Sequence, residues 1–147
     1  MKVQEIMTKN PVSVTPGATI REAAQLMQRE GTGVIPVIDA QETKRLVGII
    51  TDRDIALRIV AEGRDGSTRV SEVMSATKLT TCKPGDDVDD AMEAMASEQV
   101  RRIPIVDERG SLVGIVAQAD IVRKANDNRK AERTVEEISR PSGKHSQ

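Results

Sequence analysis

The sequence contains no Phe, Tyr or Trp, and it has one cysteine and one histidine in 147 residues. Without aromatic side chains, the chain cannot build the stacking surfaces that hold single-stranded nucleic acid. The single cysteine, Cys82, cannot form an internal disulfide, which favours a reducing compartment. No stretch approaches the roughly 18 consecutive apolar residues of a membrane span. Aliphatic side chains and backbone groups therefore have to form the core and hold any bound ring.

The charge is balanced, with 22 basic and 23 acidic residues and a formal net charge of -1. This composition supplies no broad basic face for a nucleic-acid backbone. Residues 1–7 also lack the apolar run of a secretory signal. We therefore expect a cytoplasmic protein that binds neither nucleic acid nor a membrane.

Side chains for catalysis are scarce. Cys82 has no histidine partner nearby in the sequence, and His145 lies in a polar C-terminal segment. No Cys/His cluster has the spacing of metal ligands. The acidic residues at 86–90 and 136–137 fit helix N-terminal charge and solvated surface. The sequence predicts a protein that is not an enzyme and has no catalytic cofactor or metal.

The chain repeats itself once, in the same order in both halves. Because there are only two copies, a pseudo-two-fold pair fits better than a solenoid. We expect the first repeat at residues 1–65, the second at 66–125 and a polar tail at 126–147. The recurring segments are residues 3–7 (VQEIM) and 70–74 (VSEVM), Ile35-Pro36 and Ile103-Pro104, and residues 46–49 and 112–115 (both LVGI).

Each half alternates strand and helix patterns. In the first half, Thr19 and Glu22 form a capping box before apolar residues spaced i, i+3, i+4, i+7. In the second half, Asp87 caps an equivalent helix. The other expected elements are strands at 12–14, 34–38 and 46–50 with a helix near 55–60, and strands at 79–81, 103–106 and 112–116 with a helix near 121–125.

Each half therefore has the order β-α-β-β-α. We expect a right-handed parallel first crossover and a hairpin between the last two strands. Three strands with helices on one face leave the other face of the sheet apolar and uncovered. Two copies packed sheet to sheet bury both faces. The sequence thus predicts an α/β (α+β) fold of two tandem βαββα repeats with pseudo-two-fold symmetry.

The apolar pattern fades from about Lys124 onward. We expect a marginal helix around residues 132–138, followed by a disordered end. Such a tail is either solvated or docks on a partner.

These segments resemble a tandem pair of cystathionine-β-synthase (CBS) domains over about residues 3–124. The most specific stretch is LVGIITDRDI at 46–55, in which Gly48, Thr51 and Asp54 match the family's Gly-x-x-Thr-x-x-Asp pattern. The resemblance implies a regulatory module that binds an adenosyl ligand in clefts between the repeats. Ligands of this family are AMP, ADP, ATP, NAD and S-adenosylmethionine. The resemblance also implies a homodimer.

The first-repeat motif allows two interpretations. Thr51 lies where a strand enters a helix, and the first amides of a helix favour a phosphate. Asp54, one turn later, can accept both hydroxyls of a ribose, as acidic residues do in dinucleotide-binding folds. The same two residues also fit a plain helix cap.

The second repeat departs from this motif because Ala117 stands where the first has Thr51, although Asp120 keeps the carboxylate. We therefore expect two unequal clefts. Arg101 and Arg102 precede the second Ile-Pro pair, where the resemblance implies phosphate contacts that guanidinium groups suit well. A solvated strand edge or a salt bridge in a dimer is the alternative for these arginines.

The resemblance places an adenine against the first strand and the Ile-Pro strand, with backbone groups reading its edge. Pro36 and Pro104 lack an amide, so they either leave neighbouring backbone groups free for a ligand or simply end a strand pairing. Val12 and Leu79 also fit core positions. The full predicted ligand-binding set is Val12, Ser13, Ile35, Pro36, Thr51, Asp54, Leu79, Thr80, Arg101, Arg102, Ile103, Pro104 and Asp120.

Two functions follow from these observations. The first is a sensor of an adenine nucleotide of the AMP or ATP type, acting in trans on an effector protein of unknown identity. Arg101 and Arg102 favour such a phosphate-bearing ligand over S-adenosylmethionine, although a sensor of NAD or S-adenosylmethionine is a variant of the same function. The second is a constitutive dimerisation or interaction module with vestigial clefts, which Ala117 favours.

Overall fold

The computed structural model describes residues 1–139. The first repeat contains α1 (Ile20–Glu30), β2 (Val34–Ile38), β3 (Leu46–Thr51), α2 (Asp52–Ile55) and a π-helical turn, η2 (Ala56–Val60). The second contains α3 (Val88–Glu98), β4 (Arg102–Val106), β5 (Leu112–Ala117) and α4 (Gln118–Ser139). The first repeat opens with the 3-10 turn η1 (Val3–Glu5), which a short strand, β1 (Thr8–Lys9), follows. The second repeat opens with the 3-10 turn η3 (Val70–Glu72).

The predicted helix caps are confirmed. At α1, the Thr19 hydroxyl accepts the Glu22 amide at 3.1 Å, while the Glu22 carboxylate accepts the Thr19 amide at 3.4 Å. At α3, the Asp87 carboxylate accepts the Asp89 amide at 2.9 Å. These bonds satisfy amides that have no partner within the helix, so each cap fixes where its helix begins.

Both predicted hairpins are present. Strands β2 and β3 pair antiparallel, and β4 pairs with β5 in the same register, so Pro36 stands opposite Ile49 and Pro104 opposite Ile115. In an antiparallel hairpin, hydrogen-bonded and non-hydrogen-bonded residue pairs alternate. Each proline lies in a non-hydrogen-bonded pair, and the pairs before and after it are the hydrogen-bonded ones. The hairpins therefore tolerate proline without losing a ladder bond.

The strand expected at 12–14 reduces to a single parallel bridge, Val14–Val37. The strand expected at 79–81 is absent, and the equivalent bridge, Cys82–Ile105, lies one residue beyond it. The Val14 amide donates to the Pro36 carbonyl at 3.1 Å, and the Ile38 amide donates to the Val14 carbonyl at 2.8 Å. The next donor along β2 would be the backbone N–H of residue 36, but Pro36 has no N–H. The proline therefore ends the ladder and leaves the residues before Val14 unpaired.

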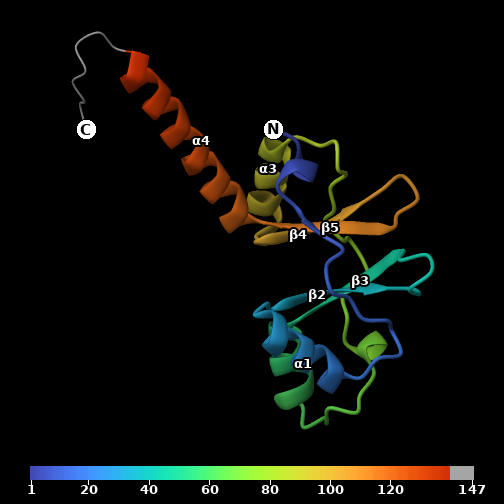
Figure 1. Cartoon of the computed structure of the whole chain (residues 1–147). Helices are drawn as coiled ribbons and strands as arrows, with labels where there is room; N and C mark the ends of the chain where they lie inside the picture. Colours follow the sequence, from blue (N-terminus) through green and yellow to red (C-terminus); the bar gives the residue numbers. More distant parts are fainter. Residues whose placement is uncertain (140–147) are drawn as a thin grey trace.

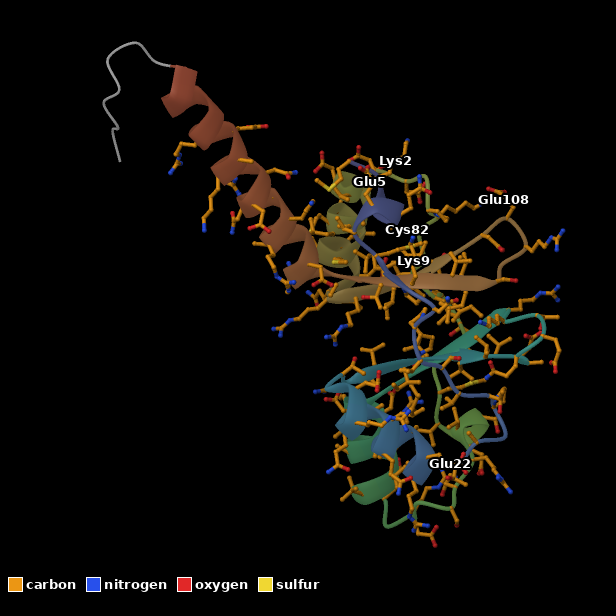
Figure 2. All side chains as sticks on the ribbon, in the orientation of Figure 1. Lys2, Glu5, Lys9, Glu22, Cys82 and Glu108 are labelled. Carbon is orange, nitrogen blue, oxygen red and sulfur yellow. The ribbon has the colours of Figure 1, made fainter. Side chains whose placement is uncertain are left out.

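The first segment of each repeat packs against the other repeat. The Val3 amide donates to the Asp86 carbonyl at 2.8 Å, and Val3 is fully buried in the core of the second repeat. Figure 2 shows Lys2, Glu5 and Lys9 on the side of Cys82, away from Glu22. Conversely, Val70 is fully buried in the core of the first repeat. The two sequence repeats therefore exchange their opening turns, and β1 becomes an edge strand beside β5.

The two sheets lie face to face, with α1 and α3 on their outer sides (Figure 1). The hairpin ends are joined directly, because the Leu46 amide donates to the Gly110 carbonyl at 3.0 Å and the Leu112 amide donates to the Lys44 carbonyl at 2.7 Å. The predicted fold class, two βαββα repeats packed sheet to sheet, is confirmed.

Helix α4 is longer than predicted and runs to Ser139, projecting away from both sheets (Figure 1). The segment from residue 126 was expected to be a polar tail with a marginal helix at 132–138. Its described part, up to Ser139, instead continues the helix that begins at Gln118. Residues such as Ala, Arg, Lys and Glu have high helix propensity, so a solvated helix can persist without an apolar stripe. The expected disordered end and His145 lie outside the described residues.

Candidate functional site

A cavity of about 300 Å³ opens between the two repeats. The first repeat contributes the segment before Val14, the end of α1 and strand β2. The second repeat contributes β4, β5 and the start of α4, and β1 closes one side. The lining residues are Thr8, Pro11, Val12, Glu30, Gly31, Thr32, Val34, Pro36, Arg102, Ile115, Ala117, Ala119, Asp120 and Arg123.

The backbone of Val12 offers an unused donor and acceptor at this cavity. Within residues 1–139, no hydrogen bond joins the Val12 amide or carbonyl to another group. In an extended segment, groups two residues apart point the same way, and Val14 uses both of its groups on β2. The Val12 groups therefore point towards the part of β2 where Pro36 has no amide to offer.

Two acidic residues line the cavity, Glu30 at the end of α1 and Asp120 in the first turn of α4. The Glu30 carboxylate accepts a hydrogen bond from Arg29 Nε at 3.4 Å. Asp120 is the acidic residue that the sequence predicts for the site. Its side chain is 32% exposed, and its Oδ1 accepts a hydrogen bond from Arg123 Nη2 at 3.0 Å. Arg102, at the start of β4, lines the same cavity. Two carboxylates and two guanidinium groups thus line this cavity between the repeats.

A second, more open cavity of about 710 Å³ adjoins the first. The two cavities share Arg102, Ala117, Ala119 and Arg123 as lining residues. Arg101 lines the outer cavity only, and its carbonyl accepts the Gln118 amide at 2.8 Å, which ties the strand edge to the start of α4. The outer part therefore adds a third guanidinium group and suits an anionic ligand extension.

The corresponding motif of the first repeat is self-satisfied. The Thr51 hydroxyl accepts the Asp54 amide, and Asp54 Oδ2 accepts the Thr51 amide, both at 3.1 Å. The structure thus shows the capping arrangement for these residues, and their ligand-binding role stays a prediction. Beside them, the Asp52 carboxylate lies so close to Gly33 that a Cβ there would meet Asp52 Oδ2 at 2.7 Å. This carboxylate places negative charge beside Gly33, the residue that corresponds to Arg101 of the second repeat.

The predicted ligand-binding residues fall into three groups. Val12, Pro36, Arg102 and Asp120 meet at the inner cavity, and Arg101 lies at the outer one. Ser13 lines a separate hollow with Arg29 and Lys44, and Thr80 lines another beside Asp90 and Glu93 on α3. The remaining residues are Thr51 and Asp54 in their mutual cap, Leu79, which is half-buried, and Ile35, Ile103 and Pro104, which are buried.

Most lining residues of the inner cavity are absent from the predicted set, Arg123 and Thr8 among them. Arg123 follows Asp120 by three positions, so helical spacing alone places it on the same face, and this signal was available. Thr8 reaches the cavity only because β1 crosses to the second repeat, which no local pattern shows.

The Cys82 thiol is held in its neutral form. Burial raises the pKa of the Cys82 thiol, and the nearby carboxylates of Asp86 and Asp90 raise it further, so the neutral form is favoured. Among the side chains described, those of residues 1–133, no three His, Cys, Asp or Glu residues converge in a way that could hold a metal ion. Across residues 1–139, every helix is too short or too polar to cross a membrane.

Comparison with known proteins assigns the family. The CBS domain matches residues 3–61 and 70–127. The CBS domain-containing protein YhcV of Bacillus subtilis is 46% identical over 137 residues, which cover 93% of this chain and 94% of YhcV.

Two solved structures are also similar. The CBS domain pair of protein MJ0100, in complex with 5'-methylthioadenosine and S-adenosyl-L-methionine, is 29% identical with a TM-score of 0.76, covering 87% of this chain and 98% of that one. Protein PAE2072 of Pyrobaculum aerophilum, complexed with AMP, is 29% identical with a TM-score of 0.74, covering 82% and 89%. The chain thus belongs to the CBS domain family and carries two CBS domains in tandem.

Proposed function

We propose that this chain is a regulatory module that binds an adenine nucleotide in the cleft at Asp120 and signals its occupancy to a partner protein. The observation that carries the proposal is the composition of two adjoining cavities that share four lining residues. Asp120, the unpaired Val12 backbone and three arginines line them. Each of these groups matches a different part of a nucleotide.

The nucleoside part fits the inner cavity. The Asp120 carboxylate can accept both hydroxyls of a ribose, as acidic residues do in dinucleotide-binding folds. The Val12 amide and carbonyl can read a base edge on which a ring nitrogen accepts and an amino group donates, and adenine has such an edge. Because no ring is available to stack, the aliphatic surfaces of Pro36 and Ile115 would cover the base.

The phosphate part fits the arginines. Arg102 and Arg123 border the inner cavity, and Arg101 extends the cationic wall outward. This wall favours AMP, ADP or ATP over S-adenosylmethionine, whose sulfonium is positively charged. The AMP complex of PAE2072 and that of CBSX2, whose structure has a TM-score of 0.72, support the first choice. Because the CBS domain pair of MJ0100 binds S-adenosyl-L-methionine, this compound is the alternative ligand that a binding experiment has to exclude.

Thermal unfolding tests the proposal. A ligand that binds only the folded chain at a hundredfold excess over its dissociation constant adds about 2.7 kcal/mol. For a chain of this length, that corresponds to an increase in Tm of roughly 5–10 °C. We expect this increase with AMP, ADP or ATP, and a smaller one with S-adenosylmethionine. If none of these ligands raises the Tm, the proposed function is wrong.

A matched pair of variants locates the site. Asp120→Ala should abolish the nucleotide-dependent increase in Tm, because it removes the ribose acceptor. Asp54→Ala should lower the Tm of the free protein through the lost helix cap, yet keep the increase. The opposite pattern would move the site to the first repeat.

A second function rests on a different observation. Leu57 is 50% exposed and Val60 is 72% exposed, on the helical segment that follows β3. Exposed apolar side chains on neighbouring turns favour association, so a constitutive homodimer that acts as an interaction module is the alternative. Light scattering of the wild type and of Val60→Glu, each with and without AMP, separates the two. A dimer that ignores AMP and dissociates in the variant would favour the interaction module.

A further inference from the structure

The residue that would hold the ribose is already engaged. Asp120 Oδ1 accepts the Arg123 Nη2 group at 3.0 Å, and both side chains line the inner cavity. A carboxylate that binds the two ribose hydroxyls uses both of its oxygens. Arg123 therefore already occupies one of the acceptor positions of Asp120 that a ribose would approach.

The ion pair is weak enough to be exchanged. The Arg123 side chain is 69% exposed and that of Asp120 is 32% exposed. Pairs this open to solvent add little stability, so separating them needs little compensation. Arg102 and Arg123 both line the inner and the outer cavity. A phosphate placed there would replace the carboxylate as the partner of Arg123.

The internal repeat supports a specific role for Arg123. Asp120 corresponds to Asp54, and the residue three positions later is Arg123 in one repeat and Leu57 in the other. Asp54 has no such cationic partner and instead caps α2 through Thr51. Only in the second repeat, among the described residues, is the ribose acceptor joined to a guanidinium group that also faces the cavity.

We propose that Arg123 is a specificity-determining residue that exchanges Asp120 for the ligand's 5'-phosphate and so selects phosphorylated over unphosphorylated adenosyl ligands. This inference rests on the proposed function of the same cleft. With AMP, the ribose takes Asp120 and the phosphate takes Arg123, so every charge keeps a partner. With adenosine, the ribose displaces Arg123 and nothing replaces the lost ion pair. Arg123 therefore favours AMP and opposes adenosine.

Calorimetric titration with AMP and adenosine tests this exchange, because the two ligands differ only in the phosphate. Arg123→Gln should weaken AMP binding about tenfold, the usual effect of losing a charge-assisted hydrogen bond. The same variant should bind adenosine more tightly, by as much as about fivefold, because Asp120 is free. Arg123→Lys should retain part of the preference for AMP. Arg129→Gln, an exposed change further along α4, is the matched control and should alter neither affinity.

The outcomes are distinguishable. If wild-type protein binds neither AMP nor adenosine, the proposed function fails and the inference fails with it. If AMP binds but Arg123→Gln weakens both ligands by the same factor, Arg123 only shapes the cleft and the exchange is refuted. If the ratio of the two affinities falls at least tenfold and adenosine binds more tightly, the exchange is supported, whereas unchanged adenosine binding would show a simple phosphate contact and refute it. A ratio that falls by less than this refutes it.

Discussion

Shortening Val3 to alanine should destabilise the second repeat, although Val3 belongs to the first repeat in sequence. Val3 is fully buried in the core of the second repeat, and its amide bonds the Asp86 carbonyl. Val3→Ala removes two carbons from that core, about 1.6 kcal/mol of transfer free energy, and a cavity adds to it. We expect a loss of about 2–3 kcal/mol, or a decrease in Tm of roughly 5–10 °C.

Hydrogen exchange identifies which repeat responds. In the Val3→Ala variant, the rate of amide hydrogen exchange should rise most at residues 86–106. The reason is that local opening releases the turn that Val3 anchors there. Val70→Ala is the matched control, since Val70 is equally buried but lies in the core of the first repeat. Its exchange should rise most at residues 20–38. An increase at residues 20–38 in Val3→Ala would refute the exchange of opening turns.

Three further outcomes follow from close contacts and charge. Gly48→Ala should lower the Tm, because a Cβ would lie 2.8 Å from Met74 Sδ, whereas Gly17→Ala, with nothing within 4 Å, should not; equal Tm values would contradict this. Arg101→Gln should weaken ATP binding roughly 3–10-fold and leave AMP binding unchanged, as calorimetry would show, because Arg101 lines the outer cavity only. The Cys82 thiol, whose pKa burial raises, should react with an aromatic disulfide only after unfolding, and fast reaction of the native protein would show that it is accessible.

Most of the fold was predictable because its signals are local. The Thr19–Glu22 box and the apolar spacing after it lie within a few residues, and the structure places α1 there. The extended strands at 12–14 and 79–81 were overestimated, since the prolines that end their ladders are far away in sequence. Knowing that Pro36 pairs with this segment requires the sheet topology, which residue patterns do not give.

The exchange of opening turns was not predictable from the residues. The segments at 3–7 and 70–74 have the same apolar pattern, so each fits either core equally well. The choice depends on chain length and connection geometry between the two sheets. For the same reason, Thr8 was absent from the predicted site, although it borders the cavity.

The site itself was predicted in part, and the balance between the clefts changed. The motif with Thr51 and Asp54 is the stronger match to the family pattern, yet these two side chains satisfy each other. Asp120, in the weaker match, makes no reciprocal cap because Ala117 has no hydroxyl, and its carboxylate faces the cavity instead. A motif shows which residue types are present, but the hydrogen bonds decide whether they are available.

The difference between the repeats explains how one cleft could become specific. Arg101, Arg102 and Arg123 correspond by position to Gly33, Val34 and Leu57, so divergence has placed three guanidinium groups in the second repeat. The first repeat has Arg53 at the position where the second has Ala119. It also has Asp52, whose carboxylate lies close to Gly33. A phosphate near Asp52 would be repelled, whereas one near Arg102 and Arg123 would be attracted. An anionic nucleotide would therefore occupy the Asp120 cleft first, and a single occupied cleft breaks the pseudo-two-fold symmetry. That asymmetry is what a partner protein could recognise, because a ligand shifts a conformational equilibrium only when it binds the two states unequally.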